Sequence, residues 1–215
     1  MINYEIFRNK LCVFEGADSV GKSSVAKILA EKLSLHGMIE SIFTFQPGDT
    51  AYGKHAETIR SFCKDKRYGF HELSNLFLFL ADRVEVTDKV VRPALEAGKT
   101  VISDRWSYST VAYQLCGKQL ADRLPQAVVD WLLGSDINLC PEPDYVFYFP
   151  QKILSSRPED HNDTFETAGG DFFSRVHEAY DIMSGAKNWY RIYPGESAEE
   201  TVDDILSGRW LIDAK

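Results

Sequence analysis

Short apolar runs alternate along the chain with longer segments in which apolar residues recur at helical spacing. The apolar runs predict five strands, at residues 10–15, 40–45, 99–104, 144–149 and 188–193. Amphipathic segments fill the gaps between them and predict helices. Strands that alternate with helices in this way are typical of a parallel sheet covered by helices on both faces, so the pattern predicts an α/β fold.

The expected helices differ in how clearly their ends are marked. The first is expected over residues 22–36. A long helical stretch over residues 71–97 should bend or break near Pro93, because proline donates no backbone hydrogen bond. In the last helix Ser197 and Glu200 have the spacing of a capping box. This last helix is expected at residues 197–206, and the others at residues 55–64, 107–115, 124–133 and 170–183.

The most polar segment, residues 151–170, combines a proline, a charged cluster and two glycines at its end. An irregular segment of this length inside a compact domain usually has a function of its own or lacks fixed structure. The chain shows no repeat, low-complexity tract or Gly/Ser linker. We therefore expect one domain over residues 1–215, with residues 151–170 as a mobile lid.

Composition narrows the classes of partner. The chain carries 32 acidic and 24 basic side chains, a net charge of −8, which disfavours nonspecific binding to nucleic acid or anionic membrane. Any phosphate site must then be a local basic pocket.

The longest apolar run, residues 76–81, is too short to span a bilayer, and the first ten residues lack the apolar core of a signal peptide. The four cysteines include no C-x-x-C pair, which favours reduced thiols, so we expect a cytoplasmic protein.

Residues 16–23 have the sequence Gly-x-x-x-x-Gly-Lys-Ser, the pattern of a phosphate-binding P-loop. A predicted strand precedes it and a long amphipathic helix follows, which is the context the pattern requires. The glycines let backbone N–H groups converge on phosphate oxygens at a helix N-terminus, whose dipole also attracts anions. We expect Lys22 to bridge the outer phosphates and Ser23 to hold Mg²⁺. The predicted ATP-binding residues are Gly16, Ser19, Val20, Gly21, Lys22, Ser23 and Ser24.

A P-loop alone leaves GTPases, motor ATPases and small-molecule kinases open. The chain has no guanine-reading N-K-x-D motif, and no D-x-x-G motif follows the loop, which favours a kinase of a small acceptor. Asp104 and Arg105 end a predicted strand, where open α/β sheets bind ligands. A guanidinium can clamp a phosphate with two hydrogen bonds while a neighbouring carboxylate positions Mg²⁺.

Several separated motifs extend this interpretation over nearly the whole chain. They are GADSVGKSS at 16–24, PGDTAYGKHAETIR at 47–60, LFLADR at 78–83, RPALEAGKTVISDR at 92–105, VISDRWSYSTVAYQ at 101–114 and DTFETAGGDFFSRVHEAY at 163–180. In type, order and spacing they resemble the thymidylate kinases, P-loop enzymes that phosphorylate dTMP with ATP. The resemblance implies a three-layer P-loop kinase fold, transfer of the γ-phosphate of ATP to dTMP to give dTDP and ADP for dTTP synthesis, a requirement for Mg²⁺, and a homodimer.

The resemblance also implies an acceptor pocket. Asp18 matches the acid that accepts a hydrogen bond from the 3′-hydroxyl of the deoxyribose, which would explain a carboxylate in a phosphate-binding loop. Phe79 matches the aromatic residue under the base, and Arg83, one helical turn later, matches the arginine that binds an exocyclic oxygen. Tyr113 matches the ring that disfavours a ribonucleotide. The implied substrate-binding residues are Asp18, Pro47, Phe79, Arg83, Arg105, Ser109, Thr110, Tyr113 and Gln114, of which Thr110 and Gln114 match contacts to the base's imide edge.

The chain departs from the family pattern after the second predicted strand. Phe45 and Gln46 stand where the family usually has an arginine and a glutamate. That arginine helps to hold the acceptor phosphate, so its absence shifts the task onto Arg105, with Arg83 and Arg60 as candidates to compensate.

A second departure concerns the transferred phosphate. No basic residue follows Asp18 in the loop, so the arginine that serves this phosphate is expected from the lid, at Arg157, with Lys152 in reserve. The expected catalytic residues are Lys22, Asp104, Arg105 and Arg157, and the expected Mg²⁺ ligands are Ser23 and Asp104.

Three alternatives stay open at this point. A kinase for dUMP or a 5-modified dUMP would present the same pyrimidine edge to the pocket. A deoxynucleoside kinase needs a carboxylate base after the second strand, where Gln46 would serve poorly. A nucleotide-binding module that has lost turnover is the third, because of the missing arginine.

Overall fold

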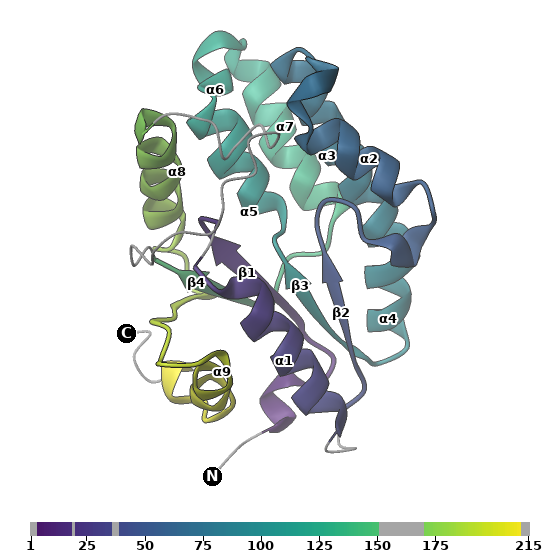
Figure 1. Ribbon diagram of the computed structural model, residues 1–215, viewed down its shortest axis with the longest axis vertical. Helices are drawn as coiled ribbons and strands as arrows, with labels where there is room; N and C mark the ends of the chain where they lie inside the picture. Colours follow the sequence, from purple (N-terminus) through teal and green to yellow (C-terminus); the bar gives the residue numbers. More distant parts are fainter. Residues whose placement is uncertain (1–3, 19, 36–38, 151–169, 212–215) are drawn as a thin grey trace.

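The strands predicted from the apolar runs form one parallel sheet in the computed structural model, which describes residues 4–18, 20–35, 39–150 and 170–211 (Figure 1). The first four strands begin and end within one residue of the predicted bounds, whereas the fifth ends two residues early, ahead of Pro194. The strand order is β2-β3-β1-β4-β5, and each neighbouring pair is parallel. The strands are β1 (Leu11–Gly16), β2 (Ser41–Phe45), β3 (Thr100–Asp104), β4 (Tyr145–Phe149) and β5 (Trp189–Arg191).

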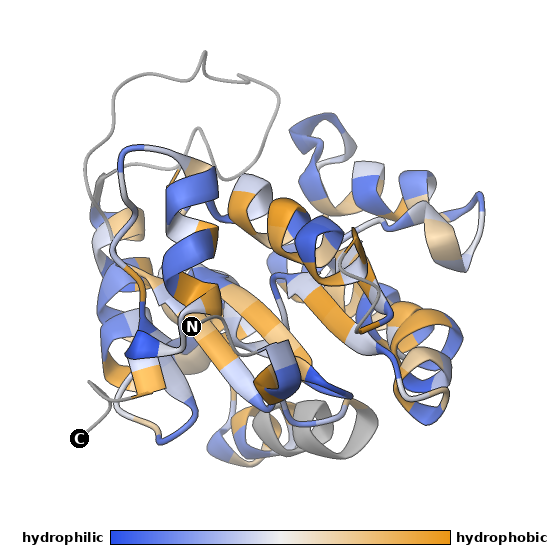
Figure 2. Cartoon of the chain, turned by 90° about the horizontal axis from the view of Figure 1, so that it is seen from below, coloured by the Kyte–Doolittle hydropathy of each residue, from blue (hydrophilic) through white to orange (hydrophobic). Residues whose placement is uncertain are grey.

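Helices cover both faces of the sheet, because side chains alternate along each strand. Cys12 and Phe14 of β1 join a buried cluster with α1 (Lys22–Leu35) and α9 (Ala198–Leu206). Leu11 and Val13 point the other way, into a cluster with α4 (Arg92–Glu96) and α8 (Gly170–Met183). Figure 2 shows the apolar strands enclosed between helices whose outer faces are polar. The predicted α/β fold of three layers is therefore confirmed.

The long helical stretch contains the predicted irregularity. α3 (Glu72–Val86) passes into a π-helical segment, Thr87–Val91, before α4 begins. Pro93 cannot donate to the carbonyl four residues earlier and its ring crowds that carbonyl, so a wider turn precedes it. The wide turn packs Val91 into the core beside the sheet.

The remaining helices differ from prediction mainly in their regularity. The expected helix at 107–115 is α5 (Ser107–Thr110) followed by a π-helical segment, Val111–Gly117. Ser197 accepts from the Glu200 amide at 3.0 Å, while the Glu200 carboxylate accepts from Glu196 at 2.7 Å, one residue earlier than a standard capping box. The other helices are α2 (Ala56–Lys64), α6 (Leu120–Arg123) and α7 (Gln126–Leu139).

Three further expectations concern membrane-spanning helices, disulfides and the lid. Among the residues that the structure describes, no helix has both the length and the apolar character needed to cross a membrane. All four cysteines are described, and none forms a disulfide. The expected lid lies outside the described residues, apart from Gly170 at the start of α8.

Candidate active site

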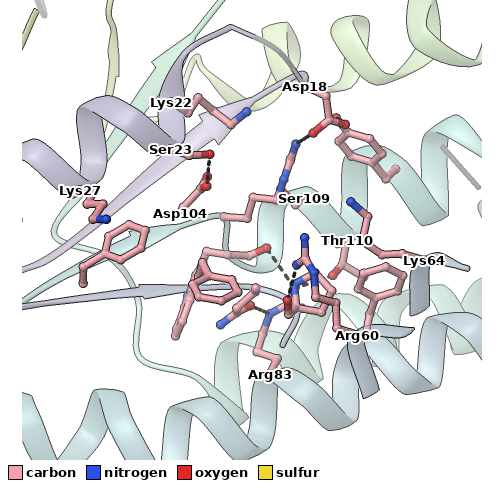
Figure 3. Close-up of a pocket in the computed structure, with 18 of the residues that line it drawn as sticks. Asp18, Lys22, Ser23, Lys27, Arg60, Lys64, Arg83, Asp104, Ser109 and Thr110 are labelled. Carbon is pink, nitrogen blue, oxygen red and sulfur yellow. Dashed lines mark hydrogen bonds and ion pairs between the residues drawn. The ribbon is translucent and has the colours of Figure 1, made fainter. Parts of the chain in front are cut away.

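A pocket of about 410 Å³ opens where the carboxyl ends of β1, β2 and β3 meet (Figure 3). The connection that follows β1 leads to β2 on one side, and the connection that follows its neighbour β3 leads to β4 on the other, so this edge is the switch point at which open α/β folds bind ligands. Its basic side chains outnumber its acidic ones by four, which makes it the local basic pocket expected in this acidic chain. The charged residues that line it are Lys22, Lys27, Arg60, Lys64, Arg83 and Arg105, with Asp18 and Asp104.

The P-loop begins at Gly16, the last residue of β1. Its φ is +134°, and a β-carbon there would lie 2.5 Å from the carbonyl oxygen of Phe149, so only glycine fits. Lys22 begins α1 and is 4% exposed, with Nζ donating to the carbonyl of Ala17 at 2.5 Å. Burial, reinforced by the charge of Arg105, lowers the pKa of Lys22 from its ordinary 10.5 to about 8. A buried cation at a helix N-terminus is suited to an anionic ligand.

Ser23 and Asp104 meet at the mouth of the P-loop. The serine hydroxyl donates to Asp104 Oδ2 at 2.5 Å. The other oxygen, Oδ1, is buried and has no hydrogen-bond partner among the described residues. Mg²⁺ prefers oxygen ligands. A hydroxyl next to a carboxylate oxygen that receives no hydrogen bond therefore fits a magnesium site. The described residues contain no cluster of three His, Cys, Asp or Glu side chains that could hold a metal, so Mg²⁺ here would need water and phosphate oxygens as further ligands.

Arg105 turns into the pocket through an unusual backbone conformation. Its φ is +74°, in the left-handed region that an arginine seldom adopts. Its amide donates to Phe14 at 3.0 Å, and the next amide, of Trp106, donates to the buried Glu15 carboxylate at 2.7 Å. Glu15 also accepts from Ser109 Oγ at 2.6 Å, so the turn is fixed from both sides. Burial raises the pKa of Glu15, against these hydrogen bonds and the charge of Arg105.

Asp18 lies opposite Arg105 rather than toward the P-loop amides. Arg105 Nη2 is 2.5 Å from Asp18 Oδ1, and the Tyr113 hydroxyl donates to Oδ2 at 2.8 Å. Burial favours the neutral acid, but the charges of Arg105 and Lys22 outweigh it and hold the pKa of Asp18 well below its ordinary value. Asp18 is therefore an anion on the side of the pocket away from Ser23, as Figure 3 shows.

The inner part of the pocket presents amide groups. Arg83 is 3% exposed and donates to Gln46 Oε1 at 3.0 Å, to the carbonyl of Trp106 at 3.0 Å and to Thr110 Oγ1 at 2.6 Å. Gln46 Nε2 and Gln114 Oε1 are buried and lack partners among the described residues. The Gln46 N–H group needs a hydrogen-bond acceptor, and the Gln114 oxygen needs a donor. The edge of a pyrimidine ring offers both.

The structure brings together most residues that the sequence predicted. Those that line the pocket are Asp18, Gly21, Lys22, Ser23, Ser24, Pro47, Phe79, Arg83, Asp104, Arg105, Ser109, Thr110, Tyr113 and Gln114. Gly16 and Val20 do not line it; the Val20 side chain packs into the core, so only its backbone can meet a ligand. Ser19, Arg157 and Lys152 lie outside the described residues.

Sequence reasoning assigned no site role to several lining residues. Lys27 lies one turn after Ser23 on α1, and Lys64 lies one turn after Arg60 on α2, so helical spacing was the available signal. The others are Phe43, Phe45, Gln46 and Trp106, which neighbour predicted site residues along the chain.

Comparisons with known proteins agree with this geometry. The thymidylate kinase family model matches residues 14–205. The chain is similar to the thymidylate kinase of Bifidobacterium longum strain DJO10A, with 31% identity over 191 residues, 88% of this chain and 91% of that protein. It is 35% identical over 182 residues to that of Chlorobium limicola, covering 80% and 81%. The crystal structure of thymidylate kinase from Ehrlichia chaffeensis superposes with a TM-score of 0.69 at 25% identity, covering 94% of this chain and 98% of that one.

Proposed function

The chain belongs to the thymidylate kinase family, and from this premise we propose how its residues transfer the γ-phosphoryl group of ATP to dTMP, which yields ADP and the dTDP used for dTTP synthesis. One observation carries the assignment of roles. The P-loop cation Lys22 and the Asp18–Arg105 pair line the same pocket, so a donor and an acceptor nucleotide can meet there.

On the donor side, the P-loop holds the triphosphate of ATP. Lys22 neutralises the outer phosphates, which return its pKa toward the ordinary lysine value. Ser23 and the open oxygen of Asp104 would hold Mg²⁺, which when bound would offset negative charge on the phosphates. Ser24 and the backbone of Gly16, Ser19, Val20 and Gly21 complete the ATP site.

On the acceptor side, the phosphate of dTMP lies against Arg105. A phosphate oxygen of dTMP attacks the γ-phosphorus, and the bond from that phosphorus to the β-phosphate oxygen breaks. The attacking oxygen is already anionic, so no general base is needed, and the residues serve to align the reactants and offset charge. Arg157 is proposed to close over the transferred phosphate from the expected lid.

The base and sugar take the inner part of the pocket. Phe79 stacks on the thymine ring, and Arg83 binds an exocyclic oxygen. The open Gln114 oxygen accepts from the ring N–H, with Thr110 alongside. Asp18 accepts from the 3′-hydroxyl. Pro47, Ser109 and Tyr113 complete the substrate site, Tyr113 at the sugar's 2′ carbon.

The proposal includes a cytoplasmic homodimer that binds no nucleic acid. Phe77 and Val84, seven residues apart on α3, are 47% and 39% exposed. Large apolar side chains on one helical stripe are typical of a surface that another subunit covers. The net charge of −8 argues against a nucleic-acid partner.

A coupled assay of ADP release tests the function, with dTMP, dUMP and thymidine supplied separately. We expect turnover with dTMP, less with dUMP and none above background with thymidine. Lys22→Ala and Arg105→Ala should abolish acceptor-dependent release while the fold is retained. Release that no acceptor stimulates would contradict the proposal, and a preference for dUMP would reassign the substrate.

A further inference from the structure

Three buried polar atoms in residues that line the pocket have no hydrogen-bond partner among the described residues. They are Asp104 Oδ1, Gln114 Oε1 and Gln46 Nε2. The proposed function uses the first for Mg²⁺ and the second for the ring N–H of the base. A buried donor without an acceptor costs free energy, so the third atom also calls for a partner. The pocket therefore holds one donor that the proposed contacts of dTMP leave without an acceptor.

The side-chain amide of Gln46 has a fixed orientation. Arg83 Nε donates to Gln46 Oε1 at 3.0 Å. Because a guanidinium group can only donate, the amide oxygen must face Arg83, and the NH₂ group must point elsewhere. Gln46 is 7% exposed, and its backbone N–H donates to the Asp104 carbonyl at 3.1 Å, which continues the pairing of β2 with β3. The unpaired donor is thus a built part of the pocket wall.

The loop that follows Gln46 is held in place as well. The carbonyl of Pro47 accepts from Arg60 Nη1 at 2.6 Å, and the amide of Gly48 donates to Asp82 Oδ1 at 2.8 Å. Asp82 is 1% exposed, so this second contact is shielded from water. Contacts from α2 and α3 therefore keep the loop, and Gln46 with it, against the pocket.

Arg83 stands between Gln46 and the residues proposed to bind the imide edge of the base. Its Nε holds Gln46, whereas its Nη2 donates to Thr110 Oγ1 at 2.6 Å (Figure 3). Gln114 follows Thr110 by about one helical turn. In a pyrimidine the ring N–H, the next exocyclic oxygen and the C5 substituent are consecutive. With the N–H on Gln114 and the oxygen on Arg83, the C5 substituent comes to lie at Gln46.

The C5 substituent decides whether the Gln46 donor is satisfied. The methyl group of dTMP cannot accept a hydrogen bond, so it leaves Nε2 unpaired. A hydroxymethyl group places an oxygen one bond beyond the methyl carbon, where it accepts from Nε2. Its own proton can turn to the exocyclic oxygen on the adjacent ring atom. The glutamate usual in the family at position 46 has no N–H to offer, so this donor is a departure of the present chain.

We propose that the protein also phosphorylates 5-hydroxymethyl-dUMP, and that Gln46 recognises this acceptor by donating from Nε2 to its 5-hydroxyl oxygen. The inference rests on the proposed function, because it extends the acceptor class of the same site. A phosphate oxygen of this nucleotide attacks the γ-phosphorus of ATP, and the bond from that phosphorus to the β-phosphate oxygen breaks. The products are 5-hydroxymethyl-dUDP and ADP, and the 5-hydroxyl group itself is unchanged.

A matched acceptor and a matched variant isolate the single hydrogen bond. 5-Ethyl-dUMP carries a group of the same size as hydroxymethyl but without the oxygen. Gln46→Met keeps the length of the side chain and removes the donor. It also removes the oxygen that faces Arg83, which affects both acceptors alike, so the quantity compared is the ratio of their kcat/KM values. The control is Gln126→Met, since Gln126 is exposed on α7 and donates to Asp130 of the same helix.

ADP release is measured in the coupled assay with dTMP, 5-hydroxymethyl-dUMP and 5-ethyl-dUMP. In wild type, kcat/KM for the hydroxymethyl acceptor should equal or exceed that for dTMP. It should exceed that for the ethyl acceptor roughly 10- to 100-fold, because the ethyl group leaves the buried donor unpaired. In Gln46→Met the hydroxymethyl-to-ethyl ratio should fall to within about twofold of unity. Gln126→Met should keep the wild-type ratio.

The possible failures are distinguishable. Equal kcat/KM for the hydroxymethyl and ethyl acceptors in wild type, or a ratio that Gln46→Met leaves unchanged, would overturn the inference. The wild-type comparison decides even where Gln46→Met fails to fold, because it needs no variant. Absence of dTMP-dependent ADP release in wild type would instead defeat the proposed function. Turnover of dTMP without a preference for hydroxymethyl over ethyl would defeat the inference alone.

Discussion

Replacing Lys22 by methionine should make the free protein more stable while it destroys activity. The folded chain lowers the pKa of Lys22 from 10.5 to about 8, because the ammonium is buried and close to Arg105. At roughly 1.4 kcal/mol per pKa unit, the fold disfavours the charged lysine by about 3 kcal/mol at pH 7. Methionine removes this cost but cannot donate to the Ala17 carbonyl, a loss of about 1–2 kcal/mol. The expected net gain is about 1–2 kcal/mol in the free energy of unfolding.

The pH dependence separates this cause from simple repacking. The unfolded chain keeps the Lys22 proton up to about pH 10.5, whereas the folded chain releases it near pH 8. Unfolding therefore takes up a proton between these values, and the free energy of unfolding rises with pH. From pH 7 to pH 9 wild type should gain about 1.4 kcal/mol relative to Lys22→Met. Lys118, whose pKa burial also lowers to about 8, contributes equally to both proteins and cancels.

Urea denaturation of both proteins at pH 7 and pH 9 measures the effect. Adding ADP should stabilise wild type and not the variant, since the phosphates lose their partner. In wild type, kcat/KM for ATP should fall above about pH 8, because it reports the free enzyme, in which Lys22 loses its proton. Parallel stability changes with pH in the two proteins, or a less stable variant at pH 7, would refute the electrostatic account.

Three other substitutions probe separate parts of the site. Asp18→Asn should lower kcat/KM for dTMP roughly 10- to 100-fold and hardly affect a 3′-deoxy acceptor, which steady-state kinetics with both acceptors would check; equal losses would place the effect on Arg105 instead. Asp104→Asn keeps the contact to Ser23 but should weaken Mg²⁺ binding. In a titration of activity with Mg²⁺, the variant should need on the order of tenfold more metal than wild type. An unshifted titration would show that Asp104 does not bind the metal. Phe77→Asp should convert the proposed dimer to monomers of unchanged thermal stability. Sedimentation that shows the same mass for both proteins would contradict the proposed α3 interface.

The sequence predicted the sheet well because its signal is local. β1 and β4 are nearly continuous apolar runs that are buried on both faces, which is the pattern of strands inside a parallel sheet. The P-loop was equally clear, since strand, glycines and lysine are adjacent in the chain. The bend before α4 was predicted in kind from Pro93, but its form as a π-helical segment depends on how Val91 packs into the core.

Features that depend on distant contacts could not be predicted. The left-handed turn at Arg105 is held by Glu15, a residue of another strand that the sequence presents only as part of an apolar run. The aromatic wall of Phe43 and Phe45 requires both side chains to share one face of β2 at the pocket. Arg60 was only a candidate, because its place depends on the course of the loop at Gly48.

Four of the six cations that line the pocket share one mode of support, which suits the pocket to a phosphate ligand. Lys22, Arg60, Arg83 and Arg105 each donate to a backbone carbonyl, those of Ala17, Pro47, Trp106 and Gly16. A carbonyl orients a cation without cancelling its charge, whereas a carboxylate would do both. The positive potential is thus kept for the ligand, at the cost seen in the lowered pKa of Lys22. Arg105 also pairs with an acid that lines the pocket, Asp18, and the proposed sugar contact would occupy that acid as the phosphate takes its place on the arginine.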